Sequence, residues 1–238
     1  RMYDRNGKLL YEFVDPKAGR RTEVPLAQIP ADVRNATIAI EDKNFYNNPG
    51  FDVNGLARAA YDDVTNHQII QGGSSITQQL VKNIYLTPEV SWDRKVKEVM
   101  IAYSLTQQMS KDQILELYLN QIYYGNQAYG IEAAAESYFG TTALKLDLAQ
   151  ASILAGLPQS PTQYDPIHNL KSAKVRQLEV LNQMVDQGYI VPDQAAGAYD
   201  EPLTFVTQGV DIQAPHFVFW VRDYLEQKYG PNFLYGTG

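Results

Sequence analysis

The sequence predicts a mainly α-helical protein, on the strength of three observations. Apolar residues recur with helical spacing from residue 32 onward, capping boxes and terminal glycines mark the ends of these stretches, and the alternation typical of strands is scarce. The chain has 238 residues, 45% of them hydrophobic and 20% charged, which is enough for a buried core and unlike a disordered chain. We therefore expect a compact helical bundle with long loops.

Charge and composition exclude several classes of function. The formal net charge of -7 argues against a broad nucleic-acid footprint, which needs Lys and Arg clustered over a whole face. Without cysteine the chain has neither disulfides nor thiolate metal sites. The three histidines, at positions 67, 168 and 216, show no metal-ligand spacing, and no G-x-S-x-G nucleophile motif occurs. Because the chain as a whole is acidic, any anion-binding site must be a small local cluster of Lys and Arg.

The first segment, residues 1–30, predicts a lead-in arm or small hairpin, because Asn6-Gly7 is typical of a tight turn between strands. The first helix is expected to begin near Pro30 and Asp32, and one of its faces carries Val33, Ala36, Ile40 and Asn44. A second amphipathic stretch covers residues 53–64. A helix packed on the core is the simpler interpretation of that stretch, and a helix that touches a bilayer is the alternative.

Capping signals place most of the remaining helices. Ser75 with Gln78, and Ser110 with Gln113, have the spacing of capping boxes and predict two helix starts. Helices are expected at 131–139, before Gly140, at 144–157, and at 171–187, before Gly188. The last of these carries an apolar stripe of Val175, Leu178, Leu181 and Val185. The tail, 214–238, predicts a final helix that runs into a linker.

The helix expected at 92–105 combines an apolar stripe with charged residues. Its predicted core face consists of Val96, Val99, Met100 and Tyr103. Arg94 and Glu98 are one turn apart on the other side, so we expect them, with Lys95, at the edge of a cleft. A solvated ion pair is the simpler alternative.

Two further clusters point to chemistry. Glu41 and Asp42 are adjacent carboxylates at a helix end, followed by the turn sequence 47–50. Residues 72–83 form a glycine loop that opens a helix rich in amides and hydroxyls, a setting in which backbone N–H groups favour an anion. Lys82 lies two turns into that helix. The segment lacks the Gly-Lys-Ser/Thr ending of a nucleotide-binding loop, so ATP is not the expected ligand.

Four motifs in this order resemble those of the peptidoglycan glycosyltransferases, the enzymes found alone or as the first catalytic domain of class A penicillin-binding proteins. The motifs are EDKNFYNNPG from Glu41, GGSSITQQLVKN from Gly72, RKVKE from Arg94 and KDQILELYLNQIYYG from Lys111. Two positions depart from that family's pattern. Asn48 stands where His is usual and cannot titrate near neutrality, whereas Ser75 replaces a Thr and keeps the hydroxyl.

The resemblance implies a lysozyme-like helical fold with a smaller, mobile, membrane-facing lobe at 51–73. It implies a glycosyltransferase domain at 31–205 and, at 206–238, the start of a linker to a transpeptidase domain. The implied reaction polymerises lipid II: the acceptor 4-hydroxyl attacks C1 of the growing lipid-diphosphate-linked strand with inversion. We expect a place on the outer face of the cell membrane, through an anchor before Arg1, and inhibition by moenomycin-type phosphoglycolipids.

The same resemblance assigns roles to individual residues. Glu41 matches the general base and Glu98 the second essential carboxylate. The expected substrate-binding cations are Lys82, Arg94 and Lys95. Their expected hydrogen-bonding partners are Ser75, Gln79 and Asn83, and Asp42 and Phe45 are expected to support Glu41. No cofactor is required, and a divalent cation, Mg²⁺ or Mn²⁺, is compatible with the family.

Two other classes stay open at the level of sequence. A lytic transglycosylase or muramidase shares the lysozyme-like shape and also centres on one glutamate, but it has no diphosphate to bind and therefore no use for a cationic cluster. A helical, membrane-associated binding module would explain the amphipathic stretches, but it gives no reason for the two glutamates in matching motifs.

Overall fold

The computed structural model describes residues 2–11, 19–52, 74–85, 92–206 and 214–229. They fall into two compact units, one from the chain's two ends (1–20 and 207–238) and one from residues 21–206. In the first unit, β1 (Met2–Tyr3) and β2 (Leu9–Tyr11) form the expected antiparallel hairpin, and α10 (Pro215–Tyr229) is the expected final helix. The Asp4 carboxylate accepts hydrogen bonds from the backbone N–H groups of Asn6 and Lys8, both at 2.8 Å.

The second unit is helical, as the sequence predicts. Its main elements are α1 (Ala31–Glu41), α3 (Ile76–Tyr85), α4 (Trp92–Gln108), α5 (Lys111–Gln121), α6 (Ile131–Phe139), α7 (Leu148–Gly156), α8 (Leu170–Asp186) and α9 (Pro192–Asp200). Short 3-10 turns at Leu26–Gln28 and Ala143–Lys145 precede α1 and α7. A small sheet in the order β3-β5-β4 is built from Arg20–Arg21, Ala128–Tyr129 and Tyr123–Gly125.

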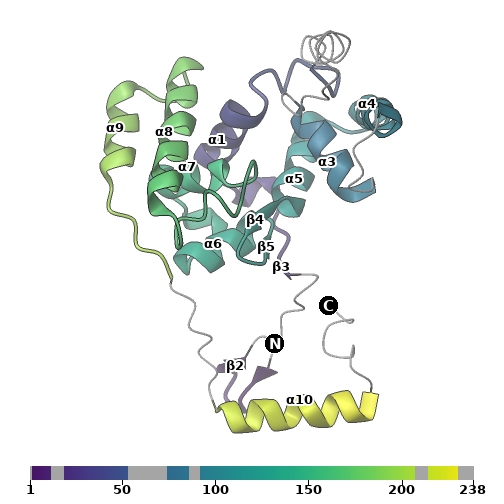
Figure 1. Cartoon of the computed structure of the whole chain (residues 1–238), viewed down its shortest axis with the longest axis vertical. Coiled ribbons are helices and arrows are strands. Elements are labelled where there is room, and N and C mark those ends of the chain that lie inside the picture. Colours follow the sequence, from purple (N-terminus) through teal and green to yellow (C-terminus); the bar gives the residue numbers. More distant parts are fainter. Residues whose placement is uncertain (1, 12–18, 53–73, 86–91, 207–213, 230–238) are drawn as a thin grey trace. The chain divides into compact units, whose positions relative to one another are not determined.

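The helices of this unit form two groups (Figure 1). Helices α1, α7, α8 and α9 pack together on one side, and α3 packs against α4 and α5 on the other. Helix α6 contacts both α5 and α7, so it connects the groups. The largest fully buried side chains include those of Tyr118, Tyr124, Tyr138 and Phe45. Among the described helices, none combines the length and the hydrophobicity that crossing a bilayer requires.

Helix α4 is oriented opposite to the expectation. Three of the four residues of its predicted core stripe, Val96, Met100 and Tyr103, are exposed, and the fourth, Val99, is half-buried. Glu98, by contrast, is only 1% exposed. The reason is the surface on which α4 packs. Helix α3 and the residue before its cap present polar groups there, so the polar face of α4 finds hydrogen-bonding partners and turns inward.

Other differences concern helix boundaries and faces. The helix expected at 144–157 is two elements, because Asp147 forms a capping box with Gln150 and starts α7 anew. On α8 the expected stripe is half wrong, since Val175 and Leu178 are exposed and Val180 and Met184 are buried instead.

Helix α1 ends at Glu41, so Asn44 does not share its face. Helix α9 was not expected, although Pro192 at its first turn is a usual start signal. The amphipathic stretch 53–64 and nearly all of the expected lobe lie outside the described residues.

Gly50 allows a close contact between the loop after α1 and helix α4. Its φ is +102°, and a Cβ atom added there would lie 2.5 Å from the Ala102 carbonyl oxygen and 2.5 Å from the Thr106 hydroxyl oxygen. Its own carbonyl accepts a hydrogen bond of 2.6 Å from the Ser75 hydroxyl. The glycine therefore connects the loop to both α3 and α4.

We expect Gly50→Ala to lower the free energy of unfolding by about 2–5 kcal/mol, the sum of strain at positive φ and of overpacking. Gly188→Ala is the matched control, because Gly188 also has a positive φ, of +74°, but meets no atom within 4 Å of an added Cβ. Its loss should be only about 1–2 kcal/mol, from strain alone. Urea denaturation of both variants measures the difference, and equal losses would contradict the close contact at Gly50.

Candidate active site

Glu41 is the last residue of α1, and its two carboxylate oxygens lie in different surroundings. Oε2 accepts a hydrogen bond of 2.6 Å from Nε2 of Gln79. Oε1 is buried and has no hydrogen-bond partner among the residues that the structure describes. Burial raises the pKa of Glu41 above its usual value, and the Gln79 hydrogen bond and the charges of Arg176 and Lys82 oppose that increase only in part. A carboxylate in this state is a stronger base than a solvated one.

A hydrogen bond from Tyr118 orients the side-chain amide of Gln79. Its Oε1 accepts a hydrogen bond of 3.1 Å from the hydroxyl of Tyr118, which is fully buried on α5. Burial, and next the charge of Glu41, raise the pKa of Tyr118 well above its usual value, so the phenol stays a donor at physiological pH. With Oε1 occupied in this way, Nε2 is the atom that faces Glu41.

Glu98 is the second carboxylate, and it is surrounded by donors. Its Oε1 accepts from Nζ of Lys95 at 2.6 Å and from Nε2 of Gln78 at 3.1 Å. Its Oε2 accepts from Arg94 at 3.2 Å. The Lys95 ammonium also donates to the Ser74 hydroxyl at 2.9 Å. Glu98 therefore holds two cations at one place, and their side chains stay 13% and 23% exposed.

The start of α3 is fixed by the predicted capping box. The Ser75 hydroxyl accepts from the backbone N–H of Gln78 at 3.1 Å, and Oε1 of Gln78 accepts from the backbone N–H of Ser75 at 3.1 Å. Because Oε1 of Gln78 serves the cap, its Nε2 is free to reach Glu98. The cap thus orients one of the amides that hold the carboxylates. A second box, between Ser110 and Gln113 at the start of α5, is also confirmed.

Asp42 anchors the loop that follows α1. Its carboxylate accepts from Nδ2 of Asn48, at 2.9 Å to each oxygen, and from the backbone N–H of Ile76 at 3.1 Å. Desolvation raises the pKa of Asp42, against these hydrogen bonds. Phe45 is completely buried, and the Lys111 ammonium lies 4.7 Å from the centre of its ring.

A cavity of about 430 Å³ lies beside these groups. Its lining comes from the end of α1, the loop after it, the start of α3 and α8: Ala39, Ile40, Glu41, Asp42, Lys43, Asn44, Asn47, Asn48, Pro49, Phe51, Asp52, Ser74, Ser75 and Gln183. Lys82 and Asn83 lie on the exposed side of α3, and the Lys82 charge acts on Glu41. Most of the predicted site residues therefore gather around the start of α3, whereas Lys82 and Asn83 lie towards its end, and the cavity lining does not include Lys82, Asn83, Arg94, Lys95 or Glu98.

Some residues of the site were missed at the level of sequence. Gln78 was expected only as a cap, and Lys111 and Tyr118 only as members of the fourth motif. Each contacts a site residue from a distant part of the chain, so no local sequence pattern predicts the contact. His168 and His216 are exposed, and His67 lies outside the described residues.

The fit of a divalent cation can be tested on the described carboxylates. No group of three or more His, Asp or Glu side chains placed to hold a metal ion occurs in this part of the chain. The oxygens of Glu98 already accept from three donors, and two of those donors are cations. The arrangement does not fit a metal at Glu98, and we assign no step to one.

Comparison with known protein families matches residues 6–185 to the transglycosylase family. The chain therefore belongs to that family. Relatives include proteins named penicillin-binding protein 1A: that of Rickettsia bellii is 41% identical over 94% of this chain, and that of Neisseria meningitidis 44% identical over 90%. The matches cover 28% and 27% of those relatives, so the chain spans less than a third of their length.

A solved structure extends the match to three dimensions. The crystal structure of penicillin-binding protein 1A from Haemophilus influenzae superposes with a TM-score of 0.55 at 25% sequence identity. The alignment covers 96% of this chain and 24% of that protein. The helical fold described above is therefore that of the corresponding part of a class A penicillin-binding protein.

Proposed function

We propose that this chain is a peptidoglycan glycosyltransferase that polymerises lipid II into glycan strands. The observation that carries the proposal is the pairing of two different carboxylates at the start of α3. Glu41 is desolvated and has one oxygen without a protein partner among the described residues, whereas Glu98 is neutralised by two cations. Glu41 suits the removal of a proton, and Glu98 orders Arg94 and Lys95, the cations that can bind an anion.

The first half of the reaction needs a base. The oxygen of the acceptor sugar's 4-hydroxyl bonds to C1 of the donor strand, and Glu41 removes the proton of that hydroxyl in the same step. In the same step the bond from C1 to the lipid diphosphate breaks, and its electron pair leaves with the diphosphate, which inverts C1. Because Oε2 is held by Gln79, we assign the proton to Oε1, a buried atom that has no partner among the described residues and that the acceptor hydroxyl has to reach.

The second half of the reaction needs cations. Negative charge grows on the departing diphosphate, and positioned cations stabilise such charge best where little water competes. Lys82, Arg94 and Lys95 are the cations that we assign to this role. Glu98 keeps two of them together by ion pairs of 3.2 and 2.6 Å. Of the expected hydrogen-bonding residues, Asn83 is exposed and is the one that we assign to the substrate. The Ser75 hydroxyl is bonded to Gly50 and Gln78, and the Gln79 amide to Glu41 and Tyr118, so these two side chains position the site instead. Asp42 and Phe45 support Glu41 from the loop behind it.

The cationic groups also favour synthesis over the two alternatives. A glycan-cleaving enzyme of the lytic type would gain nothing from buried ion pairs beside its base, since water or an internal hydroxyl displaces no diphosphate. A binding module without catalysis would not need a desolvated carboxylate such as Glu41, which destabilises the folded chain when it is ionised. Both features are accounted for by transfer from a lipid-diphosphate donor.

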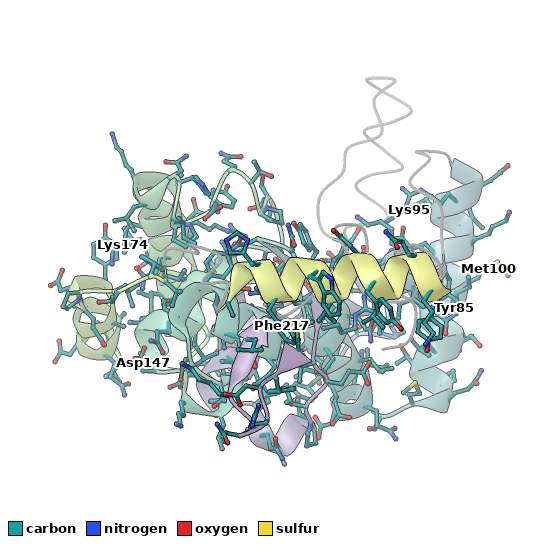
Figure 2. The ribbon with its side chains drawn as sticks, turned by 90° about the horizontal axis from the view of Figure 1, so that it is seen from below. Tyr85, Lys95, Met100, Asp147, Lys174 and Phe217 are labelled. Atoms are coloured by element: carbon teal, nitrogen blue, oxygen red, sulfur yellow. The ribbon has the colours of Figure 1, made fainter. Side chains whose placement is uncertain are left out.

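The setting of the proposed reaction is the outer face of the cell membrane. Lipid II carries a polyprenyl chain, so the enzyme has to work at a bilayer. Exposed apolar side chains on α4, from Val96, Met100 and Tyr103, support such a contact. Figure 2 shows Met100 pointing outward from α4, on the opposite side from Lys95. An anchor before Arg1 and a linker from 206 to a transpeptidase domain are further parts of this proposal, which requires no cofactor.

The proposal is tested by Glu41→Gln, a change that keeps the size and most hydrogen bonding but removes the basic oxygen. We expect the turnover of lipid II to fall by roughly 10²–10⁴, the usual contribution of a general base. The measurement is separation of glycan products by length in detergent at neutral pH. Glu201→Gln, which changes an exposed carboxylate after α9, is the control and should polymerise normally. Near-normal polymerisation by Glu41→Gln would refute the mechanism, and cleavage of glycan by the wild type would favour the lytic alternative.

The proposed diphosphate site should also bind phosphoglycolipids of the moenomycin type. We expect Lys82→Ala to weaken their binding by about 1.5–3 kcal/mol, the scale of a hydrogen bond to a charged group. Lys97→Ala is the matched control and should bind normally, because Lys97 lies in the same motif on α4 but is exposed and has no assigned role. Calorimetry on both variants makes the comparison. Equal affinities for Lys82→Ala and the wild type would move the anion site elsewhere.

A further inference from the structure

Both the nitrogen and the oxygen of the Asn48 side-chain amide form hydrogen bonds. Its Nδ2 donates to the two Asp42 oxygens, at 2.9 Å each, and its Oδ1 accepts from Nζ of Lys111 at 2.9 Å. The same Oδ1 accepts from the backbone N–H of Gly50 at 3.0 Å. The amide thus lies between a carboxylate and an ammonium and hydrogen-bonds with both.

These contacts connect segments that surround the cavity. Asp42 follows α1 and also binds the backbone N–H of Ile76, at the start of α3. Lys111 is the first residue of α5, and its ammonium covers the ring of Phe45. The loop between Asp42 and Gly50, which supplies much of the cavity lining, is therefore held to α3 and α5 through Asn48.

We propose that Asn48 is a positioning residue: its amide couples the Asp42 carboxylate to the Lys111 ammonium, and this bridge holds the 42–50 loop, and Glu41 beside it, in reactive geometry. The inference rests on the proposed function, because the geometry that it protects is that of the Glu41 base. Asn48 touches no reacting atom in this account and acts through its neighbours.

An amide suits this bridge because it donates and accepts at the same time and does not titrate. A neutral imidazole could do the same, with one nitrogen donating to Asp42 and the other accepting from Lys111. An imidazolium could not, because both of its nitrogens are donors and its charge repels the ammonium. A histidine at this position would therefore maintain the bridge at high pH and lose it at low pH.

Among the described residues, the charged groups near the bridge come from the end of α1, the loop after it and α5. Lys43 and Asp52 line the same cavity as Asn48. The end of α1 supplies Glu41 and Asp42, and α5 supplies Lys111 and Asp112, whose carboxylate accepts from the Tyr46 hydroxyl at 3.0 Å. Helices α3 and α4 meet this loop through neutral groups, at the Ser75 hydroxyl, the Ile76 N–H, the Ala102 carbonyl and the Thr106 hydroxyl. Desolvation raises the pKa of Asp42 and lowers the pKa of Lys111, so each charge depends on its partner across the amide.

The test compares Asn48→His and Lys111→Met with the wild type, by kcat and KM for lipid II between pH 5.5 and 8.5. The ratio of kcat for Asn48→His to that of the wild type should lie within about threefold of one at pH 8.5. It should fall at least tenfold towards pH 5.5, with a midpoint near the ordinary imidazole pKa of about 6.5. The effect of Glu41 titration cancels in that ratio. Lys111→Met should give a lower ratio that does not vary with pH, because it breaks the bridge without adding a titrating group.

A ratio for Asn48→His that stays constant with pH would overturn the proposal, because Asn48 would then only fill space. A cycle of Asn48→Ala, Lys111→Met and the double variant gives a second readout, in kcat and in melting temperature. We expect the double variant to be no worse than the worse single variant. Losses that add fully would mean that the two residues act separately, and would also overturn the proposal. If the wild type does not polymerise lipid II, the proposed function fails, and the melting temperatures alone decide whether the bridge exists.

Discussion

Two neighbouring amides at the start of α3 hold the two glutamates of the site. Gln78 donates to Glu98 at 3.1 Å and Gln79 donates to Glu41 at 2.6 Å. Consecutive residues on a helix point about 100° apart, so α3 has to lie between the end of α1 and the inner face of α4. The cap at Ser75 sets where both amides emerge. One helix start therefore determines the distance and the orientation between the two carboxylates.

The same helix start gives the glutamates opposite electrostatic settings. Glu41 receives one hydrogen bond from a neutral amide and is otherwise desolvated, so its pKa is raised. Glu98 is nearly inaccessible but is bound to the cations Arg94 and Lys95, so its charge is compensated on the spot. A proton acceptor and an anion-binding cluster can therefore operate side by side. This division of roles is the physical basis of the proposed transfer reaction.

Local signals in the sequence predicted the local features. The capping boxes at Ser75 and Ser110 are correct because each is complete within four residues. The orientation of α4 could not be predicted, because its amphipathic stripe indicates a core face, whereas the polar partners of Glu98 come from a different helix. The positions of Tyr118 and Lys111 were missed for the same reason. Long-range hydrogen bonds determined which face became the inner one.

The central claim is that burial raises the pKa of Glu41, because the groups that favour its ionised form only partly offset the loss of water. The measurement that tests it most directly is the titration of the Glu41 side-chain carbon by ¹³C NMR, with Glu41→Gln used to assign the signal. The account predicts a pKa above the ordinary value of 4.5, with the base active at higher pH and inactivated as the pH falls through that raised value. A pKa at or below 4.5 would show a well-solvated or ion-paired carboxylate and would contradict the account.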